Sequence, residues 1–295
     1  HLVSGLLARD PDLRVLFVEP PADPLHDLRS GRRPRGRRGA RAHARDGDGD
    51  GDGDGDGDGR LYRFRPVKWL PRRWDADADD RLARAIAREA RRLGMRHPAL
   101  WINDPRAAAL STQTGWPTLY DITDDWVVAD RPAEERERLA AGEQTLLQTA
   151  AEVVACSPEL VRRKSAARAG RPISLIPNAV DVAAYRRRLP RPADLPDGVI
   201  ALYVGTVHTD RFDVETCART ADQMRGIGTV VLVGPMLLDA ADTARLRAAG
   251  VVDLGARPRE AVVGYLQHAD VLIVPHLVTE FTDSLDPIKL YEYQA

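Results

Sequence analysis

The feature of this chain that most constrains its fold is a series of short apolar segments separated by stretches of helical periodicity. Over 198–295 the segments "VIALYVG", "GTVVLVGP", "GVVDLGA" and "ADVLIVP" follow one another, and a helix is expected after each. Strands this apolar are typical of parallel sheets that are covered by helices on both faces. The sequence therefore predicts a doubly covered parallel α/β sheet in this part of the chain.

A similar alternation is predicted over 1–182. A helical start leads into the apolar strand "RVLFVEPP", and the strands "PALWIND", "PTLYDI", "AEVVACS" and "ISLIP" come later. A helix is expected over about 132–149, and Ser157 with Pro158 is expected to begin another. We therefore predict two α/β domains facing across a cleft, with these boundaries: 1–182 for the first domain, 183–197 for a linker and 198–295 for the second domain.

One segment, 31–59, has the composition of a disordered insert. It holds seven arginines in "GRRPRGRRGARAHARD" and then an alternation of Asp and Gly. A segment of this kind cannot bury enough apolar area to fold. We expect a solvated loop. There are two alternatives: its arginines contact anionic lipid, or its aspartates bind Ca²⁺.

The overall charge and the cysteines narrow the classes of partner and compartment. Lys and Arg number 43 against 44 Asp and Glu, so no global field draws the chain to nucleic acid. Cys156 and Cys217 have no metal-ligand spacing, which indicates buried thiols in a reducing compartment. No apolar run has the length of a membrane span, and we expect a cytoplasmic protein.

Small and polar residues follow the predicted strands, where open parallel sheets bind ligands. Gly205 lets a ligand approach the backbone closely, and Arg211 offers a planar fork of donors that suits a pyrophosphate. The chain lacks the glycine patterns of nucleotide oxidoreductases and P-loop enzymes after its strands. The residues at these strand ends include Thr123, Asp124, Asp125, Gly205, Thr206, His208, Arg211, Gly234, Pro235, His276 and Glu280.

The last predicted helix carries charge next to Pro287. Lys289 and Glu292 are three residues apart and therefore share a helical face. A carboxylate such as Glu292 can accept two hydrogen bonds from the hydroxyls of a ribose, and Lys289 could meet phosphate charge. A plain surface salt bridge between the two residues is the alternative.

Several of these strings together resemble a known family. The segments "YDITDDW", "IPNAVD", "LYVGTVHTDRFDVE", "VVLVGP" and "ADVLIVPHLVTEFTDSLDPIKLYEYQA" are similar to group 1 (family 4) glycosyltransferases, above all to the teichuronic-acid-type branch that makes cell-wall polysaccharides. The similarity covers most of the chain except 31–59. It implies a GT-B fold, in which two Rossmann-like parallel-sheet domains face each other across a cleft and the second of them, 198–295, is incomplete. It also implies transfer of a sugar, with retention of configuration, from a nucleotide-diphosphate sugar.

The resemblance also implies roles for particular residues. Glu292 matches the second glutamate of the family's Glu-x7-Glu motif, which holds the donor ribose. The first position falls on Ser284, with Asp283 or Asp286 as stand-ins. Arg211 and Lys289 lie where the family neutralises the diphosphate, and no metal or other cofactor is expected. The remaining donor-side residues are Gly205, Thr206, Gly234 and Pro235.

On the acceptor side, Thr123 stands where many relatives have a histidine, and a threonine cannot act as a base. Asp124 or Asp125 is then the nearest candidate for a catalytic base. An N-cap role for Asp125 is the alternative.

The combined prediction is a retaining hexosyltransferase acting on a saccharide or lipid-linked acceptor of the cell envelope or of an exopolysaccharide. It would lie in the cytoplasm at the inner membrane face, held by exposed arginines within 81–92. A non-catalytic sugar-nucleotide-binding scaffold is an alternative, and a nucleotide-sugar epimerase is another. The resemblance further implies that the chain is a fragment cut at both ends, inside its donor site at 295 and before a first strand at residue 1.

Overall fold

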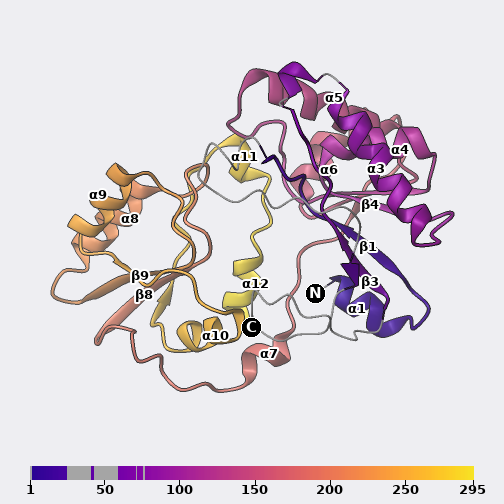
Figure 1. Cartoon of the computed structure of the whole chain (residues 1–295). Helices are drawn as coiled ribbons and strands as arrows, with labels where there is room; N and C mark the ends of the chain where they lie inside the picture. Colours follow the sequence, from indigo (N-terminus) through magenta and orange to yellow (C-terminus); the bar gives the residue numbers. More distant parts are fainter. Residues whose placement is uncertain (1, 25–40, 43–58, 71, 76) are drawn as a thin grey trace. The chain divides into compact units, whose positions relative to one another are not determined.

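The computed structural model describes residues 2–24, 41–42, 59–70, 72–75 and 77–295 (Figure 1). The chain divides into two compact units, which are His1–Asp121 with Arg138–Val153, and Ile122–Glu137 with Val154–Ala295. The boundary between the units passes through two strands of one sheet. The division between the units falls near residues 121, 137 and 153 and not at 183–197. The linker at 183–197 therefore stays a prediction.

The first unit contains a three-stranded sheet of order β1-β3-β2, preceded by helix α1 (Leu2–Arg9). Strand β1 (Val15–Val18) is the predicted "RVLFV" strand and pairs in parallel with β3 (Leu61–Phe64). Strand β2 (Arg41–Ala42) adds to the edge of β3 in the antiparallel direction. At these two positions the prediction of disorder is wrong, because their backbone groups pair with β3. Apart from them and Gly59, the predicted insert 31–59 lies outside the described residues.

A second sheet has the order β4-β5-β6-β7. Strand β4 pairs in parallel with β5, and β6 pairs in parallel with β7. All four strands were expected from the apolar segments of the sequence. Their bounds are Leu100–Ile102 for β4, Thr118–Ile122 for β5, Glu152–Ala155 for β6 and Ser174–Leu175 for β7.

The helices of this part follow the predicted periodicity. Helix α3 (Ala78–Arg92) buries Ala83 and Ala87 against Leu110 of α4 (Ala108–Thr114). Ser157 accepts a hydrogen bond from the Leu160 amide and so caps α6 (Pro158–Lys164), as predicted. The other helices here are η1 (Arg72–Trp74), η2 (Pro105–Ala107), α5 (Ala133–Thr149), η3 (Ser165–Arg168) and α7 (Val182–Arg186).

The C-terminal sheet is parallel and has the order β10-β9-β8-β11. Helices α8 and α9 cover one face and α10 the other (Figure 1), and a separate apolar core lies on each face. The predicted doubly covered sheet is confirmed. The bounds are Val199–Val204 for β8, Val214–Gln223 for α8, Gly228–Val233 for β9, Ala240–Ala248 for α9, Val252–Asp253 for β10, Arg259–Gln267 for α10, Val271–Leu272 for β11, Glu280–Asp283 for α11 and Ile288–Gln294 for α12.

The strand order of this sheet marks a place for a ligand. The chain moves outward from β8 through β9 to β10, and then returns to place β11 on the other side of β8. The order of the strands thus reverses between β8 and β11. In open α/β sheets ligands bind at the carboxyl ends of the strands that flank such a reversal.

Both cysteines are free and buried, as predicted. Among the residues that the structure describes, no helix is both long enough and apolar enough to span a bilayer.

Candidate functional site

The loops that follow β8 and β11 are joined by backbone hydrogen bonds. The Leu277 amide donates to the Arg211 carbonyl at 2.8 Å, and the Asp213 amide donates to Pro275 at 2.8 Å. Phe212 and His276 form an isolated antiparallel bridge between the same loops. Residues that the sequence placed after two different strands, among them Arg211 and His276, therefore lie side by side at the reversal point.

Two glycines let the backbone close up at this edge. Gly205 has a φ of 137° and Gly234 a φ of 152°, and both values disfavour any other residue. A Cβ on Gly234 would overlap the carbonyl oxygen of Gly205, and a Cβ on Gly205 would lie 3.0 Å from the Lys289 Nζ. Glycine at both positions is thus a packing requirement that leaves room for the lysine.

The neighbouring Thr206 and Pro235 contribute backbone contacts. The Thr206 carbonyl accepts a hydrogen bond from the Tyr203 hydroxyl at 3.1 Å, and the Pro235 carbonyl accepts one from the Val207 amide at 2.9 Å. Both predicted residues therefore shape the loops of this edge.

Lys289 is a largely buried cation without a carboxylate partner in the described part of the chain. Its Nζ donates to the Tyr203 hydroxyl at 2.6 Å, lies 4.0 Å from the centre of that ring and lies 3.4 Å from His276 Nε2. Burial, together with the positive charge of Arg211, lowers the pKa of Lys289 to about 7, and the negative charge of Glu292 offsets this lowering only in part. Burial raises the pKa of the Tyr203 hydroxyl, so the phenol stays neutral and supplies no counter-charge.

His276 shares this environment. Burial lowers its pKa to about 4, and the nearby Lys289 and Arg211 act in the same direction. The imidazole is therefore neutral, and Lys289 and Arg211 are the side chains that can carry positive charge here. An anion of the size of a phosphate group would stabilise the charged form of Lys289 there.

Arg211 is the second cation of the site. Its Nε donates to Asp210 at 2.9 Å, and its guanidinium lies 5.4 Å from the centre of the Phe281 ring. Asp124 belongs to the same electrostatic group, because its interaction with Arg211 opposes the rise that burial causes in the pKa of Asp124. The structure therefore brings Asp124, Arg211, Gly205 and Lys289 into one neighbourhood.

Asp125 has a different environment. Its side chain is 1% exposed, one oxygen accepts from the Lys164 Nζ at 2.6 Å, and the other lies 3.4 Å from Arg163 Nη1. Helix α5 begins only at Ala133, so the side chain caps no helix here. Asp125 forms a buried ion pair with α6.

Glu292 and Asp286 both accept hydrogen bonds from tyrosines. Glu292 Oε1 accepts from the Tyr185 hydroxyl at 2.7 Å and lies 3.9 Å from Arg259 Nη2. Asp286 uses both oxygens, one for the Asn178 amide at 2.7 Å and one for the Tyr291 hydroxyl at 2.8 Å. No ion pair joins Lys289 to Glu292 among the described residues, so the alternative of a plain surface salt bridge is not observed, although Glu292 raises the pKa of Lys289 electrostatically.

Ser284, at the position where the resemblance implies a glutamate, is fully buried. Its hydroxyl donates to the Phe281 carbonyl at 2.7 Å, and its own carbonyl accepts from the Ser157 hydroxyl at 2.6 Å. Asp283 beside it is exposed. Two acidic residues could replace that glutamate. Asp286 has both carboxylate oxygens hydrogen-bonded within the protein, whereas Asp283 is accessible to a ligand.

Sequence reasoning missed three side chains of the site. Tyr203 and Asp210 contact the two cations directly, and Tyr185 contacts Glu292. A hydroxyl near the end of the otherwise apolar strand β8 was the one signal for Tyr203. Tyr185 lies 107 residues before its partner and has no local signal.

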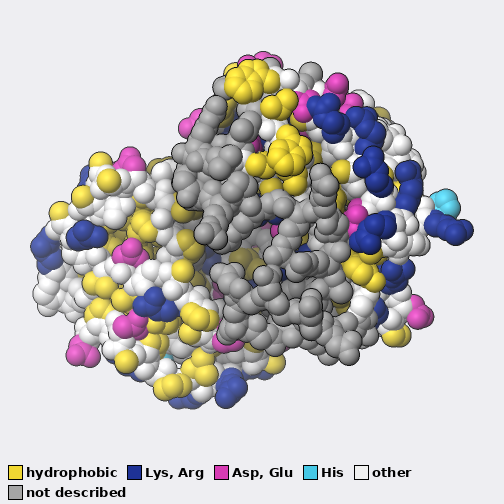
Figure 2. All heavy atoms as spheres, in the orientation of Figure 1, with side chains coloured by type: hydrophobic (Ala, Val, Ile, Leu, Met, Phe, Trp, Pro, Cys, Tyr) yellow, Lys and Arg dark blue, Asp and Glu magenta, His cyan; other side chains and the backbone are white. Residues whose placement is uncertain are grey.

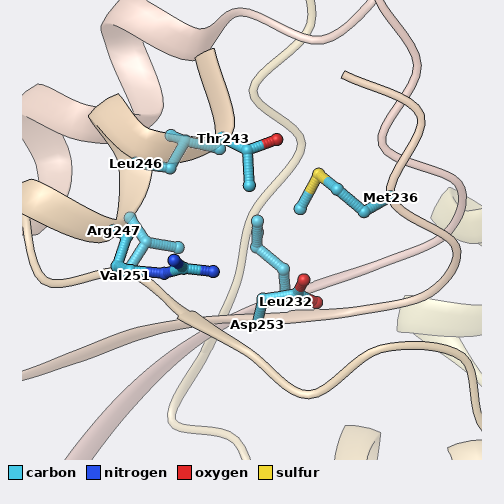
Figure 3. Close-up of a pocket in the computed structure, with 7 residues that line it drawn as sticks. All are labelled: Leu232, Met236, Thr243, Leu246, Arg247, Val251 and Asp253. Atoms are coloured by element: carbon cyan, nitrogen blue, oxygen red, sulfur yellow. The ribbon is translucent and has the colours of Figure 1, made fainter. Parts of the chain in front are cut away.

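A separate pocket of ≈ 130 Å³ lies between α9 and the strands β9 and β10, where side chains of the helix face those of the strands and of the loop after β9 (Figure 3). It is lined by Leu232, Met236, Thr243, Leu246, Arg247, Val251 and Asp253. The predicted site residues do not line it. Within the described residues, no three His, Cys, Asp or Glu side chains gather as a metal site would require.

Comparison with known proteins gives a match in structure and none in sequence. No family model matches the chain, and no curated protein matches it. HepE from Anabaena, solved in complex with UDP, is 17% identical with a TM-score of 0.50; the match covers 76% of this chain. The chain spans less than two thirds of HepE, 62% of its length.

Two further solved structures cover more of the chain. OtsA in its apo form is 11% identical with a TM-score of 0.60, over 92% of this chain and 74% of OtsA. The α,α-trehalose 6-phosphate synthase from Burkholderia multivorans is 11% identical with a TM-score of 0.55, over 95% and 81% of the two chains. At these identities the likeness is one of fold. The chain has the α/β fold with parallel sheets that these GT-B glycosyltransferases share.

Proposed function

We propose that this chain binds a nucleotide-diphosphate sugar and transfers the sugar to an acceptor hydroxyl. The observation that carries the proposal is the largely buried cation Lys289, which forms no ion pair among the described residues and lies with Arg211 and the close-packed Gly205 at the strand reversal. The fold likeness to HepE, whose structure was solved with UDP, supports the same class of ligand.

In this proposal the two cations bind the diphosphate. Charge accumulates on the diphosphate as the bond between it and the anomeric carbon breaks, and preorganised cations stabilise that charge without reorganisation. Lys289 forms no ion pair among the described residues that a ligand would have to break, whereas the Arg211 guanidinium already donates a hydrogen bond to Asp210. Lys289 is therefore the larger contributor, and the pair acts without a metal ion or other cofactor.

Glu292 is proposed to bind the ribose hydroxyls of the donor. Its Oε1 accepts from Tyr185, while Oε2 has no hydrogen bond among those of the described residues. A carboxylate held by one oxygen keeps the other free to accept a hydroxyl group.

The chemistry that we propose is retaining transfer of a hexose. The bond from the anomeric carbon to the diphosphate oxygen breaks, a bond to the acceptor oxygen forms on the same face, and the acceptor proton goes to the departing diphosphate. Asp124 is the side chain near Arg211 that could assist this proton, and Asp125 is less suited because both of its oxygens are engaged. The acceptor is proposed to be a saccharide or lipid-linked intermediate of the cell envelope, at the cytoplasmic face of the membrane, as in the teichuronic-acid-type branch.

Binding of UDP, GDP and TDP by calorimetry tests the donor site. Lys289→Met should weaken the best-bound nucleotide about 10- to 100-fold, from the ~1.5–3 kcal/mol of a hydrogen bond to a charged group. Lys68→Met is the matched control, because Lys68 is paired with Asp23 in the first unit. Equal affinity in wild type and Lys289→Met would refute the assignment.

A non-catalytic sugar-nucleotide-binding protein is the second candidate. It is favoured by the buried Ser284 and the occupied Asp286, which leave fewer groups for the hydroxyls of a sugar. Incubation with radiolabelled nucleotide sugars and an acceptor mixture separates the two. Transfer of label with release of nucleoside diphosphate supports the enzyme, binding without either supports the scaffold, and interconversion of sugars on an intact donor would indicate an epimerase.

A further inference from the structure

We propose that the pocket between α9 and the strands β9 and β10 binds an α-amino acid with a branched aliphatic side chain of the size of leucine. All residues that line this pocket belong to the second unit, and none of them is among the predicted donor-site residues. The proposal therefore goes beyond the proposed sugar transfer and does not depend on it.

The interior of the pocket is apolar. Leu232 is fully buried, Leu246 is 2% exposed and Val251 is 7% exposed. Met236 is half-buried, and its unbranched thioether can change conformation to fit a ligand. An apolar cavity of about 150 Å³ holds a benzene molecule. The ≈ 130 Å³ of this pocket therefore leave room for the four carbons of an isobutyl group.

Two charged side chains of opposite sign complete the lining. Arg247 comes from α9 and Asp253 from the edge strand β10, and both side chains are exposed. In the described part of the chain neither forms an ion pair, whereas Arg245 of the same helix pairs with Glu215. Two opposite charges that line one pocket without pairing leave a place between them for the charged groups of a ligand.

The free atoms of these two side chains suit an ammonium and a carboxylate group. Asp253 Oδ1 accepts from the Gly255 amide at 2.8 Å, and Oδ2 has no hydrogen bond among those of the described residues. A carboxylate oxygen accepts well from an ammonium group, and the fork of a guanidinium matches a carboxylate. Figure 3 shows Arg247 extending toward the strands, on the side of the pocket where Asp253 lies. One α-carbon carries both charged groups in an amino acid, so its side chain can enter the apolar interior.

This combination favours a zwitterion over an anion. Basic and acidic side chains are interspersed over α8 and α9 on the face shown in Figure 2, so no field of one sign covers this surface. An anion bound at Arg247 would have the carboxylate of Asp253 as a repelling neighbour. The ammonium group of an amino acid turns that neighbour into a partner.

Calorimetric titration with L-leucine, in the absence of nucleotide, tests the proposal independently of the donor site. The wild type should bind leucine. Alanine should bind about 50-fold more weakly, because it lacks three carbon groups that the apolar interior would bury. Leucinamide lacks the carboxylate and 4-methylpentanoate lacks the ammonium group, and each should bind about 10-fold more weakly than leucine.

Two variants test the charged side chains. Arg247→Gln and Asp253→Asn should each weaken leucine binding about 10-fold, and Asn keeps an oxygen acceptor for the Gly255 amide. Arg247→Gln should bind leucinamide as the wild type does, because this ligand has no carboxylate to lose. Asp253→Asn should likewise leave the affinity for 4-methylpentanoate unchanged or raise it.

The matched control is Arg219→Gln, which removes an exposed arginine from α8, the other helix on this face of the sheet. It should bind leucine as the wild type does. Absence of leucine binding by the wild type would overturn the proposal, as would equal affinity for leucine and 4-methylpentanoate or an equal loss in the control. Thermal melts check that the variants fold, and the ligand series on the wild type decides the question without them.

Discussion

Two lysines of the second unit, Lys164 and Lys289, are both largely buried on short helices, and their surroundings are opposite. Lys164 lies 2.6 Å from a carboxylate oxygen of Asp125, which is itself 1% exposed. Lys289 contacts a neutral phenol and a neutral imidazole and forms no ion pair among the described residues; the cation Arg211 lowers its pKa, and the more weakly acting Glu292 opposes that effect. One lysine has an ion-pair partner within the fold, and the other has none among the described residues.

The difference separates a structural role from a binding role. Removing either partner of a buried ion pair lowers the free energy of unfolding, because the remaining charge is then buried without a counter-charge. A buried charge without a counter-ion already costs stability in the folded chain, and an anionic ligand can offset that cost. On this basis Lys164 anchors α6, and Lys289 is available to an anion.

The largest effect is expected from breaking the compensated pair. Asp125→Ala removes the carboxylate that pairs with the buried Lys164, and the free energy of unfolding should fall by about 3–5 kcal/mol. Urea unfolding measures this loss. The double variant Asp125→Leu, Lys164→Met should recover most of it. If Asp125 instead acted as the catalytic base, Asp125→Asn would abolish turnover while stability stayed near that of the wild type.

The matching change at the uncompensated lysine should have the reverse signature. Lys289→Met removes a buried charge that forms no ion pair and whose burial outweighs the attraction of Glu292, so the free energy of unfolding should stay the same or rise. Nucleotide affinity should fall about 10- to 100-fold. Urea unfolding and calorimetry on the same preparation measure both quantities. A loss of stability like that of Asp125→Ala would show that Lys289 is structural.

The pH dependence of stability sharpens the contrast. The pKa of Lys289 is about 7 in the folded chain and has a usual value of 10.5, so between these values the unfolded chain binds more protons. Its contribution to stability therefore rises with pH across that window, by at most about 1.4 kcal/mol per pH unit. The difference in unfolding free energy between wild type and Lys289→Met should rise from pH 7 to pH 10. A flat difference would contradict the lowered pKa.

The smallest effect is expected at Glu292. Tyr185→Phe removes one hydrogen bond to Glu292, worth about 1 kcal/mol of stability, because water can reach the half-buried carboxylate afterwards. Urea unfolding measures the change, and Tyr291→Phe, which removes a comparable bond to Asp286, is the control. A loss above about 3 kcal/mol for Tyr185→Phe would place Glu292 with Asp125 among the structural groups.

Much of the fold follows from local pattern. The apolar runs predicted the strands of the C-terminal sheet, and their two-sided burial followed from their lack of alternation. Ser157 before Pro158 predicted the beginning of α6, because a capping hydroxyl and a proline at the first turn act within four residues. Backbone preferences that act between residues about four positions apart can be predicted from the sequence.

The site was only partly predictable, because its pairings are tertiary. The glycines and Arg211 were found from their places after strands. The partner of Asp125 lies 39 residues away and that of Lys289 lies 86 residues away, so neither the ion pair nor the missing counter-ion has a sequence signal. The sequence thus offered Asp125 as a base or a cap, and the structure shows it in an ion pair.

Proton uptake on nucleotide binding tests the central claim most directly. At pH 8, Lys289 with a pKa of about 7 is mostly neutral, and a bound diphosphate should restore its charge. Calorimetric titration with UDP, or with GDP or TDP if one of these binds better, in buffers of different ionisation enthalpy should show uptake of close to one proton by the wild type and none by Lys289→Met. Binding without proton uptake by the wild type, or equal uptake by both proteins, would contradict the account.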